Sequence, residues 1–205
     1  MKRALFPVLL LLAFPALPAS GDDAQSLLAS VRRAYTASPS FTLAFTQTYA
    51  PAGFPEVKPE KGTLVLAAPN KARFDYAGAE GKVFSFDGTA ARQYVAADGQ
   101  MVVKNLTAEE KTRLPLVFLE STEALLARFD AAGAGSEVTL TPKTRGSLAK
   151  ITLGVSPQGE VSRLVVLDAD GNRTTFTFSE KKPGPARPLS DFALTPPAGT
   201  KILTE

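Results

Sequence analysis

Residues 41–103 alternate apolar with polar side chains, as β-strands with one dry face do. Phe41, Leu43 and Phe45 are separated by threonine and alanine, so they share one face of an extended chain. Glycine, proline and asparagine interrupt the pattern several times, and these residues favour turns over the interior of a sheet. The stretch predicts six short strands in an antiparallel meander, whose apolar face the rest of the chain must cover.

The first residues have the order of a secretory signal peptide. Lys2 and Arg3 precede an apolar run, which small residues follow. The alternative is an uncleaved membrane anchor, but the run is shorter than the about 20 residues that such a helix needs, and prolines break it. We predict a signal peptide over residues 1–21, with an approximate cleavage site, and a single exported, soluble domain over residues 22–205.

Composition narrows the possible functions. Without Lys2 and Arg3, the 23 basic residues fall to 21 against 20 acidic ones, a net charge of about +1 that gives no reason to expect nucleic acid as a partner. The chain has no cysteine and no histidine, which removes disulfides, the thiol nucleophile and the commonest metal ligands. An enzyme would need carboxylates, serine or lysine alone. We predict that the protein is a monomer, is not an enzyme and has no cofactor or metal.

Residues 24–35 have the periodicity of an amphipathic helix. Leu27, Leu28, Val31 and Tyr35 recur at helical spacing, so they lie on one face. We predict that this helix begins the mature chain and packs its apolar face on the sheet.

An insertion after the meander also favours helices. Thr107 and Glu110 have the spacing of a capping box, and Pro115 can restart a helix because the first turn does not need its missing N–H group. Apolar residues continue as far as Phe129, and glycines at 133–135 end the segment. Two inserted helices are predicted.

The rest of the chain favours strands. Alternation and turn residues predict them over residues 138–142, 148–155, 161–167, 174–178, 191–195 and 201–203, with a flexible linker at 181–185. The total of about ten or eleven antiparallel strands, nearly all with one apolar face, indicates a large curled sheet with a dry concave side. The helices must cover that side. Periodicity leaves open whether the enclosed space is filled or hollow.

The mature chain resembles the LolA family of periplasmic outer-membrane lipoprotein carriers along essentially its whole length. Six pieces, each weak alone, carry the resemblance in the same order: residues 41–47, 62–76, 87–88 with Tyr94, 114–119, 168–172 with Phe176 and Phe178, and 192–199. The resemblance implies an incomplete, unclosed antiparallel β-barrel, with a helical lid over a hydrophobic cavity. It also implies a carrier, or chaperone, that takes acylated lipoproteins from an inner-membrane ABC transporter to an outer-membrane receptor.

Strand alternation and the resemblance together define a candidate site. The predicted acyl-chain cavity wall is Phe45, Leu64, Leu66, Ala72, Phe74, Tyr76, Phe84 and Tyr94. The predicted lid residues are Leu27, Leu28, Val31, Leu116, Val117 and Leu119. One departure stands out: the family's arginine before the Pro-Asn turn, which resembles a latch to the lid, is Ala68 here. How the lid closes is therefore an open question at the level of sequence.

Three other functions fit parts of the pattern. A periplasmic sensor or lipid-binding module on the same half-barrel would share the fold and the cavity but not the partners. A hydrolase would have to use Ser85, Asp87 or Glu80, although no nucleophile elbow or paired base is visible. A structural barrel with a filled core would take up no lipid at all.

Overall fold

The computed structural model describes residues 21–205 except 113 and 115. The predicted signal peptide lies outside the described residues apart from Gly21, which begins the first helix. Within the described part, no helix is long and apolar enough to cross a membrane. The strands form one 12-stranded sheet in the order β12-β6-β5-β4-β3-β2-β1-β11-β10-β9-β8-β7.

The six predicted strands of the meander are all present. They are β1 (Ser40–Ala50), β2 (Glu60–Ala67), β3 (Lys71–Ala77), β4 (Lys82–Phe86), β5 (Ala90–Val95) and β6 (Gln100–Asn105). The second half contributes β7 (Phe129–Ala134), β8 (Glu137–Pro142), β9 (Leu148–Val155), β10 (Val161–Asp168), β11 (Arg173–Gly184) and β12 (Lys201–Thr204).

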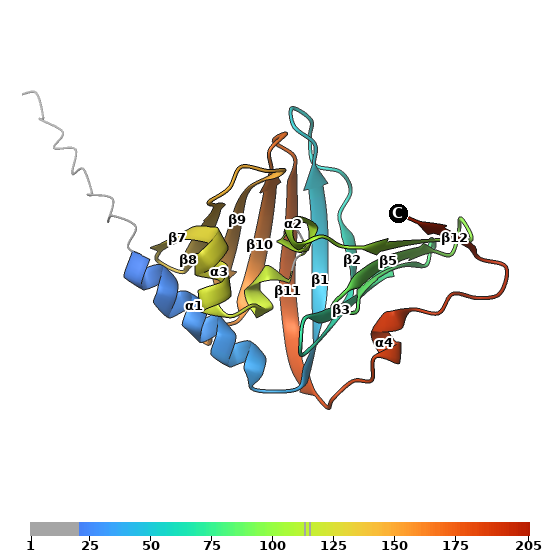
Figure 1. The fold of residues 1–205 in the computed structure, drawn as a ribbon, viewed down its shortest axis with the longest axis horizontal. Helices are drawn as coiled ribbons and strands as arrows, with labels where there is room; N and C mark the ends of the chain where they lie inside the picture. Colours follow the sequence, from blue (N-terminus) through green and yellow to red (C-terminus); the bar gives the residue numbers. More distant parts are fainter. Residues whose placement is uncertain (1–20, 113, 115) are drawn as a thin grey trace, which may run out of the picture.

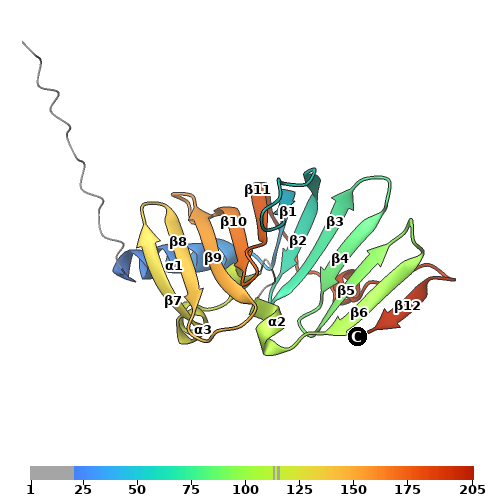
Figure 2. The same cartoon turned by 90° about the horizontal axis from the view of Figure 1, so that it is seen from above.

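Strand β1 stands at the centre of the sheet and joins its two halves. It pairs with β2 on one side and with β11 on the other, antiparallel in both cases. The sheet curls without closing, so β7 and β12 lie at opposite ends of an arc (Figure 2). This is the incomplete barrel that was predicted. β12 departs from the expected antiparallel order because it runs parallel to β6, with Lys201 opposite Gln100.

Three local predictions need correction. Phe129 begins strand β7 instead of ending a helix, because its backbone pairs with Pro142 and the alanine-rich segment after it pairs with β8. Residues 181–184 are not a flexible linker, because they extend β11 along the start of β1. Residues 191–195 are not a strand: α4 (Ser190–Ala193) is a short helix on the convex side, where Arg73 donates to the Asp191 carbonyl at 3.3 Å.

The N-terminal helix and the helix just before β7 lie over the half of the sheet that contains β7 to β11 (Figure 1). Helix α1 (Gly21–Thr36) packs against β7, β8 and α3 (Thr122–Arg128). Between β6 and β7 come also α2 (Ala108–Thr112) and the 3₁₀ helix η1 (Val117–Leu119). Thr107 and Glu110 form the predicted capping box: the Thr107 N–H donates to Glu110 Oε2 at 2.9 Å, and the Glu110 N–H donates to Thr107 Oγ1 at 3.2 Å.

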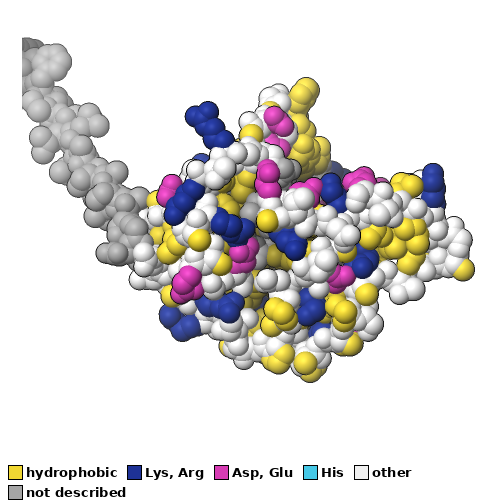
Figure 3. Space-filling view, viewed as in Figure 1, with side chains coloured by type: hydrophobic (Ala, Val, Ile, Leu, Met, Phe, Trp, Pro, Cys, Tyr) yellow, Lys and Arg dark blue, Asp and Glu magenta, His cyan; other side chains and the backbone are white. Residues whose placement is uncertain are grey.

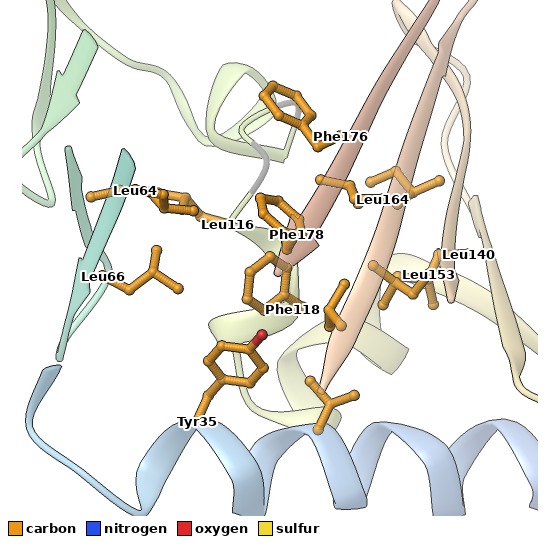
Figure 4. Packing of buried hydrophobic residues seen from close by; sticks show 14 of the residues in the cluster. Tyr35, Leu64, Leu66, Leu116, Phe118, Leu140, Leu153, Leu164, Phe176 and Phe178 are labelled. Carbon is orange, nitrogen blue, oxygen red and sulfur yellow. The ribbon is translucent and has the colours of Figure 1, made fainter. Parts of the chain in front are cut away.

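The hydrophobic core lies on the concave side of the sheet. Side chains from both halves of the sheet point into it, and Phe118 from η1 and Tyr35 from α1 meet them from the opposite side (Figure 4). The core is therefore made by the sheet and its helical cover together.

Candidate functional site: an apolar cavity beside an inserted cover

Aromatic rings form the middle of the concave wall. Register places Leu64 opposite Phe74 and Phe74 opposite Phe84, so these side chains share one face of three neighbouring strands. Phe74 contacts Phe45 with ring centroids 5.3 Å apart, and it contacts Phe176 of β11 at 5.8 Å. These edge and tilted contacts join the two halves of the sheet through a single apolar surface.

A cavity of about 320 Å³ lies beside this aromatic wall. Its size is at the lower end of the range of about 300–1,000 Å³ that ligand pockets occupy. The lining residues are Phe74, Tyr76, Phe84, Leu114, Val166, Asp168, Asn172, Thr174 and Phe176. Most of them are apolar, and the polar ones come from the end of β10 and the start of β11. The cavity therefore combines a dry wall with a polar rim, which is the arrangement that an amphiphilic ligand requires.

A polar network completes the rim on the side of β2 to β4. The Tyr76 hydroxyl donates to Gln47 Oε1 at 2.6 Å, and Lys82 Nζ lies 4.0 Å from the centre of the Tyr76 ring. Lys82 also pairs with Glu60 at 2.5 Å. Burial and then the nearby Glu60 charge raise the pKa of Tyr76, so its hydroxyl remains a neutral donor at neutral pH. Tyr76 therefore connects the lining of the cavity to this ion pair.

Apart from Tyr94, the predicted wall residues fall into two groups. Phe74, Tyr76 and Phe84 line the cavity. The others, Phe45, Leu64, Leu66 and Ala72, are buried in the adjoining core, and Leu66 also borders a second cavity. Whether any of them contacts an acyl chain stays a prediction. Sequence reasoning missed Phe176 as a wall residue, although its alternation with threonines on β11 was visible.

Tyr94 is placed differently from the prediction. Phe84 is paired with Gln93, whereas Tyr94 is paired with Val83. Because paired residues share a face and neighbouring ones alternate, Tyr94 lies on the face opposite Phe84. The strand phase assumed for β5 is therefore corrected, and Tyr94 does not belong to the concave wall.

Residues 106–121, which we call the inserted cover, close the concave side. Leu116 and Phe118 are 5% and 1% exposed, and Leu119 is partly buried against the same core. The Phe118 ring lies 5.0 Å from that of Tyr35 and 6.1 Å from that of Phe178, so it links α1 to β11 (Figure 4). The side chain of Val117 lies outside what the structure describes. The cover was predicted, but Phe118 was not singled out, since a single 3₁₀ turn has no periodicity to reveal it.

Polar contacts hold the cover at its two ends. Arg32 of α1 donates to the Leu119 carbonyl at 2.8 Å, and Arg128 pairs with Glu120. At the other end, Lys104 pairs with Glu110 at 2.8 Å. A hydrogen bond from Lys104, followed by bonds from Thr107, lowers the pKa of Glu110 to about 2.

Cavities lie on more than one side of the cover. Leu114 borders both the main cavity and a smaller one of about 210 Å³. Leu119 borders another of about 310 Å³, which Arg32 and Ala68 also line. Ala68, the residue at the family's arginine position, therefore faces open space. Arg32 makes a cover contact from the opposite side of that space.

The predicted lid residues on α1 occupy a more tightly packed place. Leu28 and Val31 belong to the core, and Leu27 is partly buried against it. A Cβ atom at Gly159 would lie 2.7 Å from the Ser30 carbonyl carbon, and one at Gly133 would lie 2.8 Å from the Asp23 carbonyl carbon. The backbone of α1 thus rests directly on the sheet, with no side chain between.

The residues considered for a hydrolase do not form a catalytic group. Ser85 is fully buried, and its hydroxyl has no hydrogen-bond partner among the described residues. Asp87 accepts from the backbone of Thr89 and Ala90 and pairs with Arg92 at 2.6 Å. These bonds lower the pKa of Asp87 although burial alone would raise it, so the carboxylate serves as a turn cap.

The protein is thus a half-barrel: an open, curled sheet with an apolar cavity under a helical cover. Residues 36–195 match the family described as "Outer membrane lipoprotein carrier protein LolA". The chain belongs to this family, as the resemblance in the sequence indicated.

Curated relatives agree with this assignment, and a solved structure has a similar fold. An outer-membrane lipoprotein carrier protein of Albidiferax ferrireducens is 27% identical over 222 residues, covering 98% of this chain and 99% of the relative. One of Xanthomonas oryzae pv. oryzae is 29% identical over 150 residues, covering 69% and 71%. The fold is similar to that of an uncharacterized conserved protein from Thermus thermophilus, with a TM-score of 0.54, 12% identity and coverage of 89% and 99%.

Proposed function

We propose that this protein is a periplasmic carrier that holds the acyl chains of lipoproteins in its apolar cavity. In this proposal it receives them from an inner-membrane ABC transporter and delivers them to an outer-membrane receptor. Family membership and the names of the relatives support lipoproteins as the cargo. The observation that carries the proposal is the cavity between the aromatic wall and the inserted cover.

Burial of hydrocarbon is enough to drive such binding. Each buried CH₂ group contributes about 0.8 kcal/mol, so one acyl chain of roughly sixteen carbons prefers a dry site over water by on the order of ten kcal/mol. No catalytic group is needed, and the working residues are the aliphatic and aromatic side chains of the wall. The polar rim at Tyr76 and Lys82 would keep the head of the cargo outside the dry space.

Uptake requires the cover to move. The main cavity is small for a whole acyl chain, and Leu114 lies between it and a space of about 210 Å³. That space shares Glu120 with the space of about 310 Å³ beside Leu119, so the three would join into one longer groove if the cover swings away. The cover and the cargo then compete for the same wall, so cargo binds only the fraction of molecules in which the cover is displaced.

The latch in this chain is assigned to Arg32. Its guanidinium donates to the Leu119 carbonyl from α1, whereas Ala68 can offer no hydrogen bond from its side chain. Arg73 is not a substitute, because it pairs with Asp75 at 2.8 Å on the convex face. A single hydrogen bond of this kind, at an exposed site, suits a cover that must open repeatedly.

Paired charge substitutions test the cavity. Phe84→Glu places a carboxylate on the half-buried edge of the wall, and Tyr94→Glu places the same charge on the opposite face of the neighbouring strand. Uptake of a fluorescent acyl probe should fall at least tenfold for Phe84→Glu and stay near wild type for Tyr94→Glu, with circular dichroism confirming that both fold. Equal uptake by the two variants would mean that acyl chains do not bind in this cavity.

Transport itself is tested in cells. Mass spectrometry of the protein isolated from periplasm should find acylated protein bound to it, and Phe84→Glu should reduce that amount. Recovery of the protein free of acylated protein, or with free lipid alone, would contradict the carrier proposal and favour a lipid-binding module.

A further inference from the structure

The loop between β1 and β2, residues 51–59, exposes apolar side chains that no part of the described chain covers. Phe54 is 73% exposed and Val57 is 48% exposed, and Tyr49 at the end of β1 is 38% exposed. Phe54 is the most exposed of the large apolar side chains in the described residues. Hydrophobic side chains gather at this projecting end of the molecule, above the end of β1 (Figure 3).

The loop is held in a defined shape. The Phe54 N–H donates to the Pro51 carbonyl at 3.0 Å, and the Val57 N–H donates to the Tyr49 carbonyl at 2.8 Å. Glu56 accepts from the Thr48 hydroxyl at 3.3 Å. Three prolines in the loop restrict its backbone further and leave few N–H groups that would have to be desolvated. Phe54 is thus presented on a stiff support, and little ordering entropy is lost when it is buried.

The same loop stands beside the mouth of the main cavity. Its Ala52 N–H donates at 3.1 Å to the side chain of Asn172, which lines that cavity. Tyr49 is paired with Thr174, another lining residue. In Figure 1 the loop after β1 and the turn between β10 and β11 project at the same end of the sheet. Whatever the loop touches therefore lies next to the cavity opening.

The charges and the shape of the loop favour a lipid surface over a protein groove. Lys58 and Lys61 are exposed and form no ion pair within the described part of the chain, whereas the nearby Glu56 has Arg173 at 3.9 Å. A projecting aromatic side chain with lysines behind it can sink its ring into the interface of a bilayer while the ammonium groups meet anionic head groups. We propose that residues 51–59 form a membrane-contact loop, which brings the cavity mouth transiently to an anionic bilayer.

The contact is weak by construction, and this suits a protein that must leave the membrane again. One aromatic ring and one valine bury less hydrocarbon than a myristoyl chain, which by itself gives only marginal and reversible binding. Binding should therefore depend steeply on Phe54 and more gently on Lys58. It should also require no cargo, so it goes beyond the carrier proposal and can fail or succeed independently of it.

A single fluorophore tests the contact directly. The chain has no tryptophan, so Phe54→Trp in the full mature protein supplies one reporter at the tip of the loop. Its emission should shift to the blue when vesicles of equal parts phosphatidylethanolamine and phosphatidylglycerol are added. Leu189→Trp, which replaces another exposed apolar residue at 56% exposure, should show no shift. No shift at position 54, or equal shifts at both positions, would overturn the proposal.

Flotation with vesicles, which needs no tryptophan, tests the same contact by a second method. Phe54→Asp should lower the fraction of protein that floats with these vesicles about tenfold, with an unchanged melting temperature and unchanged uptake of a soluble acyl probe. A blue shift of Phe54→Trp that follows protein concentration in the absence of vesicles would indicate self-association and contradict the lipid contact. Flotation of Phe54→Asp equal to that of the wild type would overturn the lipid contact, whereas wild-type protein that floats with the vesicles but takes up no acyl probe would contradict the carrier proposal alone.

Discussion

Helix α1 and the inserted cover both lie on the concave side of the sheet, but they are attached to it in different ways. The backbone of α1 approaches β7 and the turn after β9 so closely that only glycine fits at Gly133 and Gly159. The cover instead touches the sheet through side chains such as Phe118, and Leu114 borders two cavities that no residue of α1 lines. Close packing keeps contacts that a cavity loses, so we expect α1 to stay in place and the cover to be the element that moves.

This difference in packing predicts which of the two predicted lid segments moves when cargo binds. The sequence shows an apolar face on α1 and apolar residues in the cover, and both sets were assigned to the lid. Burial does not separate them either, because Val31 and Phe118 are each 1% exposed. The two segments differ in their packing: the backbone of α1 lies directly against Gly133 and Gly159, whereas cavities border the cover. Substitutions that weaken α1 should therefore lower stability alone, and substitutions that weaken the cover should also raise affinity for cargo.

The largest loss of stability is expected where the backbone of α1 contacts the turn after β9. Gly159→Ala puts a Cβ atom 2.7 Å from the Ser30 carbonyl carbon at a φ of +80°, so steric overlap and backbone strain add to roughly 2–5 kcal/mol of lost stability. Gly199→Ala has a similar φ of +86° with nothing within 4 Å and isolates the strain. Thermal unfolding should show a much larger loss for Gly159→Ala. If its acyl-probe affinity rose, α1 would be part of the moving lid.

Leu119→Ala should have a smaller effect on stability and the opposite effect on binding. Its side chain is partly buried and borders a cavity, so truncation is expected to reduce the free energy of unfolding by about 1–3 kcal/mol. Because the closed state weakens, acyl-probe affinity should rise severalfold. Leu126→Ala on α3 is the matched control, since Leu126 is partly buried against the same core but lies outside the cover. Parallel loss of stability and affinity in Leu119→Ala would favour an ordinary filled core.

Alternation in the sequence predicted most of the sheet because the side-chain period of a strand repeats wherever one face is dry. It predicted β1 to β4 and the wall at Phe74 and Phe84 on that basis. It failed at Tyr94, where Gln93 occupies the concave position and Tyr94 supplies the apolar signal from the other face. It also failed at Phe129, because a run of alanine and glycine carries little preference for either strand or helix once tertiary pairing decides.

The hydrogen bond that we propose as the latch could not be predicted, because it joins residues that are distant in the sequence. Arg32 and Leu119 are 87 positions apart, and the acceptor is a backbone carbonyl that no side-chain pattern reveals. Ala68 showed only that the family's arginine is missing. The cavities themselves were also invisible to periodicity, which tells apolar faces from polar ones but not filled space from empty space.

Removing the hydrogen bond proposed as the latch should modestly shift the equilibrium of the cover from the closed to the open state. Arg32→Gln loses the charged donor to the Leu119 carbonyl, and at this exposed site the closed state should weaken by about 0.5–1 kcal/mol. Acyl-probe affinity should then rise about two- to fivefold with little change in melting temperature. Arg33→Gln removes the same charge from the next position of α1, where the side chain is exposed, and should leave affinity unchanged. Equal affinities for the two variants would remove the role assigned to Arg32.

The smallest effect is expected at the capping box that begins α2. The pKa of Glu110 is lowered from 4.5 to about 2 by hydrogen bonds from Lys104 and Thr107, so the folded state favours the charged carboxylate. A lowered pKa contributes stability that is present above the unfolded value and is lost as pH falls through the folded value. Between about pH 4.5 and pH 2 this end of the cover should loosen, and affinity for an acyl probe without a titratable group should rise slightly. Other carboxylates titrate in the same window, so the informative quantity is the difference between the wild type and Glu110→Gln. That variant should show the higher affinity already at pH 7 and a flatter acid profile, whereas identical profiles would mean that the capping box does not restrain the cover.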